Sequence, residues 1–159
     1  MSTRQDVFQV SADEPESVRL QIERDLPYDG PYSADTVRAA AGGVYALVRY
    51  LNNATGPWNG EATLRLAPTV DDVLGGLHSA AYALDQLLSQ LAGALTRQAA
   101  DPTLYDDRRD RSAAGVATDA ADRILAARDA AMALAETLTD VRARTVHLGR
   151  DLCTGGENR

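Results

Sequence analysis

The sequence predicts an all-α fold, a three-helix up-down-up antiparallel bundle with a less regular N-terminal segment. Three observations support this prediction. Apolar residues recur at alternating steps of four and three residues over the stretches 34–54, 70–99 and 113–152, which is the periodicity of helices. Aromatic residues make up only 5% of the chain, so alanine, leucine and valine must form the core, as in closely spaced helices. A chain of 159 residues is long enough for one domain.

The predicted domain organisation has three parts: an irregular N-terminal segment over 1–32, the helical bundle over 33–152, and a flexible tail over 153–159. Within the first part, residues 7–10 (Val-Phe-Gln-Val) have the composition of a short strand. Residues 16–25 fit either an alternating strand or a helix with one apolar face. The acids and proline that precede them favour the helix.

The first long helix is predicted over 34–54, with Ser33 as its N-cap. Gly42 and Gly43 lie inside it, and two explanations stay open: a close approach of another helix, or a local kink. In the linker 55–69 that follows, alternating apolar residues predict a short strand. This strand would pair with the N-terminal segment as a minor β ribbon.

The second and third helices carry the longest apolar seams, and Thr69 with Asp72 resembles a capping box at the start of the second. The seam of the second helix consists of Val70, Leu74, Leu77, Ala81, Leu84, Leu88, Leu91 and Leu95. The seam of the third consists of Ala113, Ala117, Ala120, Ile124, Ala127, Ala131, Leu134, Leu138, Val141, Thr145, Leu148 and Leu152. We therefore expect five leucines to be buried: Leu84, Leu88, Leu91, Leu134 and Leu138.

Residues with catalytic or metal-binding potential do not form a recognisable constellation. The two histidines, His78 and His147, have no glutamate three residues before them, as a di-iron bundle requires, and both are predicted to lie on the surface. Cys153 is the only cysteine, and no nucleophile elbow or phosphate-binding loop is present. Asp71 and Asp72 are interpreted as acids that favour a helix N-terminus. The sequence predicts a non-enzymatic protein with no catalytic residue, cofactor or metal site.

The charge distribution argues against nucleic acid as a partner. The formal net charge is −7, and the arginines of the segment 106–111 are interleaved with as many aspartates. No run of about 20 apolar residues predicts a membrane span. No Sec-type signal peptide is evident, which predicts a cytoplasmic protein while leaving export by another route open.

The middle helix is almost without charge, since Asp85 is the only charged residue between Val73 and Thr96. Exposed bundle helices usually carry charged residues there. Two explanations stay open: cover by the chain's own N-terminal segment or linker, or a second surface that contacts another molecule. The second explanation predicts a protein partner or a homo-oligomer. The candidate contact residues are Tyr82, Gln86 and Ser89 on the middle helix. The stripe Leu125, Met132 and Val146 on the last helix is the next candidate, and a third helix or the N-terminal segment could also cover it.

The turn residues Trp58-Asn59-Gly60 lie between two predicted helices and resemble the Trp-x-Gly turn of the WXG100 (ESX-type) secretion substrates. That resemblance implies a helical hairpin over about 34–99 and a role as a secreted substrate or adaptor. More broadly, the chain resembles the Arg/Ala-rich helical proteins of unknown function of actinobacteria, a resemblance that implies no activity. The acidic charge adds a third alternative, an antitoxin-like or chaperone-like partner of a basic protein.

Overall fold

The computed structural model describes residues 15–108 and 111–149, and only the backbone of 15–17. Within these ranges the fold is all-helical and contains no strand, so the predicted β ribbon is not supported. The predicted strand at 7–10 and the predicted tail at 153–159 lie outside the described residues. The chain divides into two compact units, one up to Asn59 and one from Gly60 onward.

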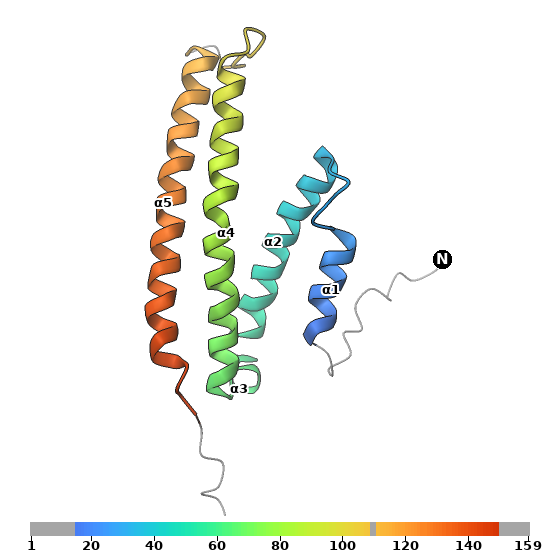
Figure 1. Ribbon diagram of the computed structural model, residues 1–159, viewed down its shortest axis with the longest axis vertical. Coiled ribbons are helices and arrows are strands. Elements are labelled where there is room, and N and C mark those ends of the chain that lie inside the picture. The colour runs from blue at the N-terminus through green and yellow to red at the C-terminus, as the bar shows by residue number, and fades with distance from the viewer. Residues whose placement is uncertain (1–14, 109–110, 150–159) are drawn as a thin grey trace, which may run out of the picture. The chain divides into compact units, whose positions relative to one another are not determined.

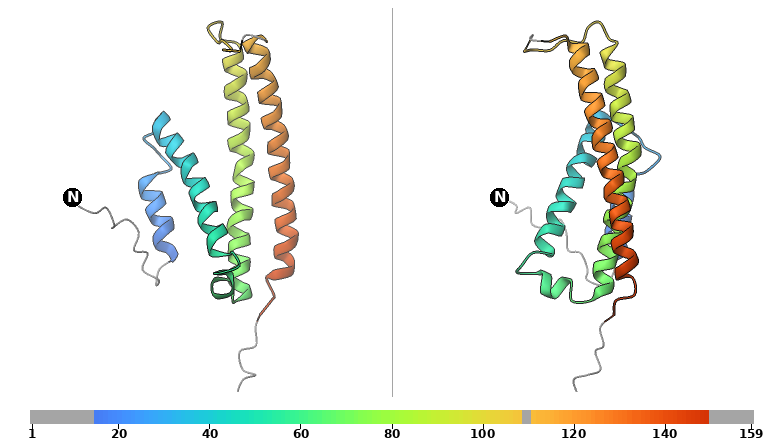
Figure 2. Two further views of the ribbon diagram at one scale, coloured as in Figure 1. Left: turned by 180° about the vertical axis from the view of Figure 1, so that it is seen from behind. Right: turned by 90° about the vertical axis from the view of Figure 1, so that its left-hand side faces the viewer.

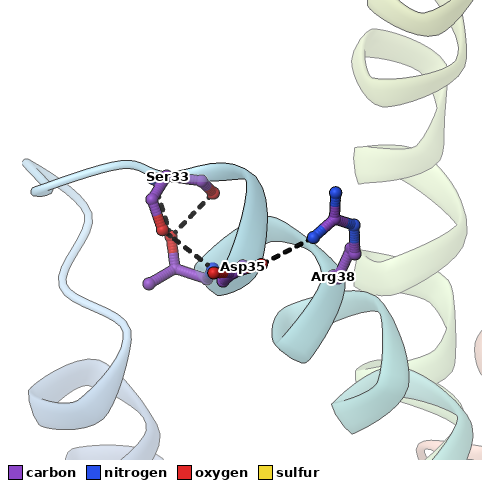
Figure 3. A network of polar contacts seen from close by, with 4 residues as sticks. Ser33, Asp35 and Arg38 are labelled. Atoms are coloured by element: carbon purple, nitrogen blue, oxygen red, sulfur yellow. Dashed lines mark hydrogen bonds and ion pairs between the residues drawn. The ribbon is translucent and has the colours of Figure 1, made fainter.

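The first unit contains the helices α1 (Pro15–Asp25) and α2 (Ala34–Ala54). The segment that fitted either a strand or a helix is therefore the helix α1. Helix α2 has the predicted bounds because its first turn is well capped. The Ser33 hydroxyl accepts a hydrogen bond from the Thr36 amide at 3.1 Å, and the Ser33 amide donates to the Thr36 hydroxyl at 2.9 Å (Figure 3).

Helix α2 buries none of its residues, although its length and apolar row are those of a bundle helix. Val37, Val44 and Val48 are all exposed. Gly42 and Gly43 lie within an unbroken helix, and a Cβ atom at either position would meet nothing within 4 Å. Within the first unit, no other element approaches these glycines.

The linker that follows α2 forms a short helix, α3 (Gly60–Thr63), where the alternation of apolar residues predicted a strand. The amide of Leu64 donates to the carbonyl of Gly60 at 2.8 Å, which completes this single turn. A strand needs a neighbour for its backbone groups, whereas a helical turn pairs them locally. That local pairing explains why the strand prediction was wrong.

The second unit is dominated by two helices of 33 residues each, α4 (Ala67–Ala99) and α5 (Ala113–Thr145). They lie side by side and antiparallel, joined at one end by the loop over 100–112 (Figures 1 and 2). Helix α4 begins three residues before the predicted Val70, with Pro68 in its first turn. Its N-cap is Leu66, which makes no side-chain cap bond, so the predicted capping box at Thr69 is wrong.

Helix α5 begins where predicted, with the Ser112 hydroxyl accepting from the Gly115 amide at 3.1 Å. It ends at Thr145, although its apolar spacing continues to Leu152. Thr145 bonds to Asp71 in the second turn of α4. Beyond Thr145, α5 would soon extend past the start of α4 and lose its partner, and a helix without a packing partner is marginal in water.

The buried residues of the α4–α5 interface are all alanines. They are Ala81, Ala92, Ala117, Ala121, Ala131 and Ala135. One predicted column of each helix does face the partner: Leu74, Ala81, Leu88 and Leu95 on α4, and Ala117, Ile124, Ala131, Leu138 and Thr145 on α5. The second column that faces the partner lies one position later in the sequence than predicted, on both helices. It consists of Asp71, His78, Asp85 and Ala92 on α4, and of Ala121, Arg128, Ala135 and Arg142 on α5.

A shift of one position means that each helix is rotated about its axis relative to the prediction. The set of buried residues changes accordingly. Leu91 and Leu134, expected to be buried, are 46% and 51% exposed, while Leu84, Leu88 and Leu138 are half-buried. His78, expected on the surface, is half-buried in the seam. The physical reason is that the rotated seam brings two pairs of opposite charges together, Asp85 with Arg128 and Asp71 with Arg142, and places buried alanines between them.

Candidate functional site

The middle of the α4–α5 interface holds an ion pair between Asp85 and Arg128. The Oδ1 atom of Asp85 accepts a hydrogen bond from Nε of Arg128 at 2.5 Å. Asp85 raises the pKa of the Arg128 guanidinium, first through this hydrogen bond and then through its charge. The only charge in the central part of α4 is therefore neutralised by α5. The exposed side of α4 remains uncharged between Val73 and Thr96.

The open end of the hairpin holds a second polar cluster. The Asp71 carboxylate accepts from Nη2 of Arg142 at 3.2 Å and from the Thr145 hydroxyl at 2.8 Å. These two hydrogen bonds, that of Arg142 above all, lower the pKa of Asp71. Gly75 makes room for the cluster, because a Cβ atom there would lie 3.2 Å from the Arg142 guanidinium carbon. Asp71 thus links α4 to α5 through its side-chain hydrogen bonds. Its predicted role as an acid at a helix start is wrong.

These contacts set the register of the hairpin. Stepping along both helices from the Asp71–Thr145 bond brings Ala81 opposite Ala135 and Leu88 opposite Arg128. In an antiparallel pair, the columns that flank the seam on one side come from equivalent heptad positions of both helices. The hairpin therefore has two distinct faces, one on each side of the seam.

The first face, here called the leucine face, comprises the leucines that the rotated seam leaves outside: Leu77, Leu84, Leu87, Leu91 and Leu134. All are exposed except Leu84, which is half-buried. The register places Leu84 beside Leu134, so the two helices contribute to one continuous apolar surface.

The second face, here called the neutral face, comprises Tyr82 and Ser89 of α4 with Leu125 and Met132 of α5. The register places Met132 beside Tyr82, and Leu125 beside Ser89. Tyr82 is 63% exposed and stacks on His78, with ring centroids 6.5 Å apart. Four of the six predicted contact residues therefore share one face.

The remaining two predicted contact residues lie at its margins. Gln86 is exposed and occupies the next column of α4, one step further from the seam. Val146 is exposed and follows the last helical residue of α5, as its C-cap.

A row of acids borders the neutral face along α5. Asp122, Asp129 and Glu136 repeat every seven residues, in the column next to Leu125 and Met132. All three are exposed, and none makes an ion pair among the described residues. The nearby arginines Arg123 and Arg128 pair with Asp119 and Asp85 instead. The rim on α5 is thus acidic, whereas the rim on α4 is uncharged between Val73 and Thr96.

Other chemistry-bearing residues do not converge in the described part of the chain. No group of three or more histidine, cysteine or carboxylate side chains there could hold a metal ion. Open depressions of the described chain include one lined by Arg108, Arg111, Val116 and Asp119 and another lined by residues of 62–69. Neither contains a histidine or a cysteine. Cys153 lies outside the described residues.

Trp58, the residue behind the resemblance to secretion substrates, lies in the segment between α2 and α3 and is 95% exposed. The Asn59 side chain donates to the carbonyl of Asn53 at 3.0 Å, which ties this turn to the end of α2. The tryptophan itself is available for contact with another molecule.

Comparisons with protein-family models, with curated proteins and with solved structures found no match. None of the described helices is both long enough and apolar enough to cross a membrane.

Proposed function

We propose that this chain is a non-enzymatic helical interaction protein, which self-associates or binds another helical protein through the neutral face. The observation that carries the proposal is the side-by-side placement of Tyr82, Ser89, Leu125 and Met132 on a helical surface without central charge. Tyrosine is enriched at binding hot spots, and methionine is frequent at adaptable contact surfaces.

The two faces of the hairpin would have different occupants. We also propose that α2 supplies the third helix of the up-down-up antiparallel bundle, packed on the leucine face. Two observations support this arrangement: α2 has an apolar row without cover, and the leucine face offers a continuous apolar surface of helical periodicity. The neutral face then remains for an external partner.

Photo-cross-linking in the native host tests the proposed function. A photoreactive phenylalanine analogue replaces Tyr82 in one variant and Ala126, an exposed residue on the outer side of α5, in a control variant. We expect a discrete adduct from position 82 and none from position 126. An adduct of twice the chain mass identifies a second copy, and any other mass identifies a different protein.

The same experiment separates a specific surface from chance collisions. Adding glutamates through Q86E and S89E should abolish the adduct at position 82, since buried unpaired charges disfavour the contact. Adding them through A130E and A133E, on exposed positions of α5 away from the neutral face, should leave it intact. Equal adducts from positions 82 and 126, or none from either, would contradict the proposed function.

The two alternatives from the sequence remain predictions. A secreted substrate of the WXG100 kind would use the exposed Trp58 turn and would be found in the culture medium. An acidic partner of a basic protein would use the acids of the hairpin.

A further inference from the structure

The acidic row beside the neutral face specifies the chemistry of the partner. Asp122, Asp129 and Glu136 follow one another at intervals of seven residues, so they form a straight line of about 21 Å along α5. Their carboxylates form no ion pair within the described chain, although the charge of Asp129 acts on the neighbouring Arg128. A molecule that covers Leu125 and Met132 would therefore lie against a line of exposed acids.

The residues that border the neutral face on its α4 side differ in charge from those on its α5 side. Along α4 the rim beside Tyr82 and Ser89 consists of Ser79, Gln86 and Gly93, which are uncharged; Asp72, seven residues earlier in the same column, lies near the start of α4. Asp85 does not contribute, because Arg128 neutralises it in the seam. Beside Tyr82 and Ser89 the surface is thus asymmetric: an apolar strip borders acids on the α5 side and uncharged residues on the α4 side.

We infer that the neutral face binds an amphipathic helix of a different protein, with arginine or lysine repeated every seven residues along one edge. This inference rests on the proposed function and names the partner of that surface. The apolar row of such a helix would cover Leu125, Met132 and Tyr82, and its basic edge would lie over the acidic row. Its other edge would meet the neutral rim of α4, where small uncharged residues allow a close approach.

A second copy of the chain is a poor match for the inferred helix with a basic edge. Outside the α4–α5 hairpin, the described helices that contain arginine are α1 and α2, with two arginines each. In each of these helices, one arginine forms an ion pair with an acid of the same helix. No described helix presents basic residues at intervals of seven along one edge without acids between them. Charge complementarity therefore favours a different, basic-edged helix over self-association.

Binding of two designed peptides to the full chain tests the inference. Both peptides are three heptads long with leucine at the seam positions; one carries arginine at every seventh position along one edge, and the other carries glutamate there. Fluorescence anisotropy at low ionic strength should show the arginine peptide binding about tenfold tighter, since three exposed ion pairs each contribute modestly. The difference should nearly vanish at about 1 M salt, where charges are screened over about 3 Å.

Matched variants locate the effect. D122N/D129N/E136Q should abolish the preference for the arginine peptide. D29N/E61Q/D107N, which removes the same number of exposed acids outside α5, should keep it. Loss of the preference in both variants would mean attraction to the net charge alone and would overturn the inference.

The outcomes also separate this inference from the proposed function. Equal affinity for both peptides that is lost in L125S would overturn the basic-edged partner and leave the neutral face as a binding surface. A second-copy adduct at position 82 in the cross-linking experiment would do the same. Absence of binding by either peptide would overturn the inference, while the cross-linking experiment would still decide the proposed function.

Discussion

Replacing Ala135 by leucine should be among the most destabilising single changes in the hairpin. Ala135 and Ala81, which the register places opposite each other, are 3% and 2% exposed. A leucine side chain has no room between helices that approach at alanine positions, so it must force them apart. Overpacking of this kind lowers the free energy of unfolding by about 1–3 kcal/mol. Thermal unfolding followed by circular dichroism should show the midpoint falling by several degrees.

The matched control is A133L, two residues earlier on the same helix, where the side chain is exposed. The same substitution there should change the free energy of unfolding by less than about 0.5 kcal/mol. Equal midpoints for A135L and A133L would mean that Ala135 does not lie in a close helix–helix contact.

The second largest loss of stability should come from truncating the seam leucines that the sequence prediction and the structure have in common. Leu88 and Leu138 are half-buried between the helices, and both the sequence and the structure place them in the interface. Replacing either by alanine should lower the free energy of unfolding by about 2 kcal/mol, the lower end of the range for buried leucines. Urea unfolding of the single variants measures this loss.

Leu125→Ala serves as the comparison, because Leu125 is an exposed leucine outside the seam. Its removal should leave the urea midpoint almost unchanged in the isolated protein. Unfolding midpoints of L88A and L138A that match the wild type would remove these leucines from the core.

The all-helical fold could be predicted from the sequence because helical periodicity and capping are local signals. The bounds of α2 follow from Ser33 and the apolar row behind it. The start of α5 follows from Ser112 in the same way. These features depend on residues three or four positions apart, which the sequence displays directly.

The rotation of the seam could not be predicted in this way, because apolar spacing points to columns of apolar residues, whereas the second columns that the structure uses carry Asp71 and Asp85 on α4 and Arg128 and Arg142 on α5. The number of leucines favours the columns that contain Leu91 on α4 and Leu134 on α5 as the ones that face the partner helix. The structure instead uses the columns of Ala92 and Ala135, where alanine permits close approach. The deciding energies come from contacts between residues more than forty positions apart, such as Asp85 with Arg128.

A signal for the cross-helix charges was nevertheless present. Asp71 and Asp85 lie fourteen residues apart on α4, and Arg128 and Arg142 lie fourteen residues apart on α5. Two equal spacings of opposite charge, on helices that run antiparallel, predict two simultaneous ion pairs. Tyr82, Gln86 and Ser89 were chosen from the lack of charge on α4, and Leu125, Met132 and Val146 as an apolar stripe of α5. The rotated seam places four of these six residues on one face.

The arrangement of both faces depends on the α4–α5 register, so an exchange of the charges of Asp85 and Arg128 tests the account most directly. D85R places two arginines against each other in the seam, and R128D places two aspartates there; each should lower the thermal midpoint. The double variant D85R/R128D restores an opposite pair in the same place and should recover most of the loss. Such recovery measures the coupling between the two positions. A double variant that loses as much as the two single variants combined would show that the residues do not meet, and would contradict the seam and the two faces built on it.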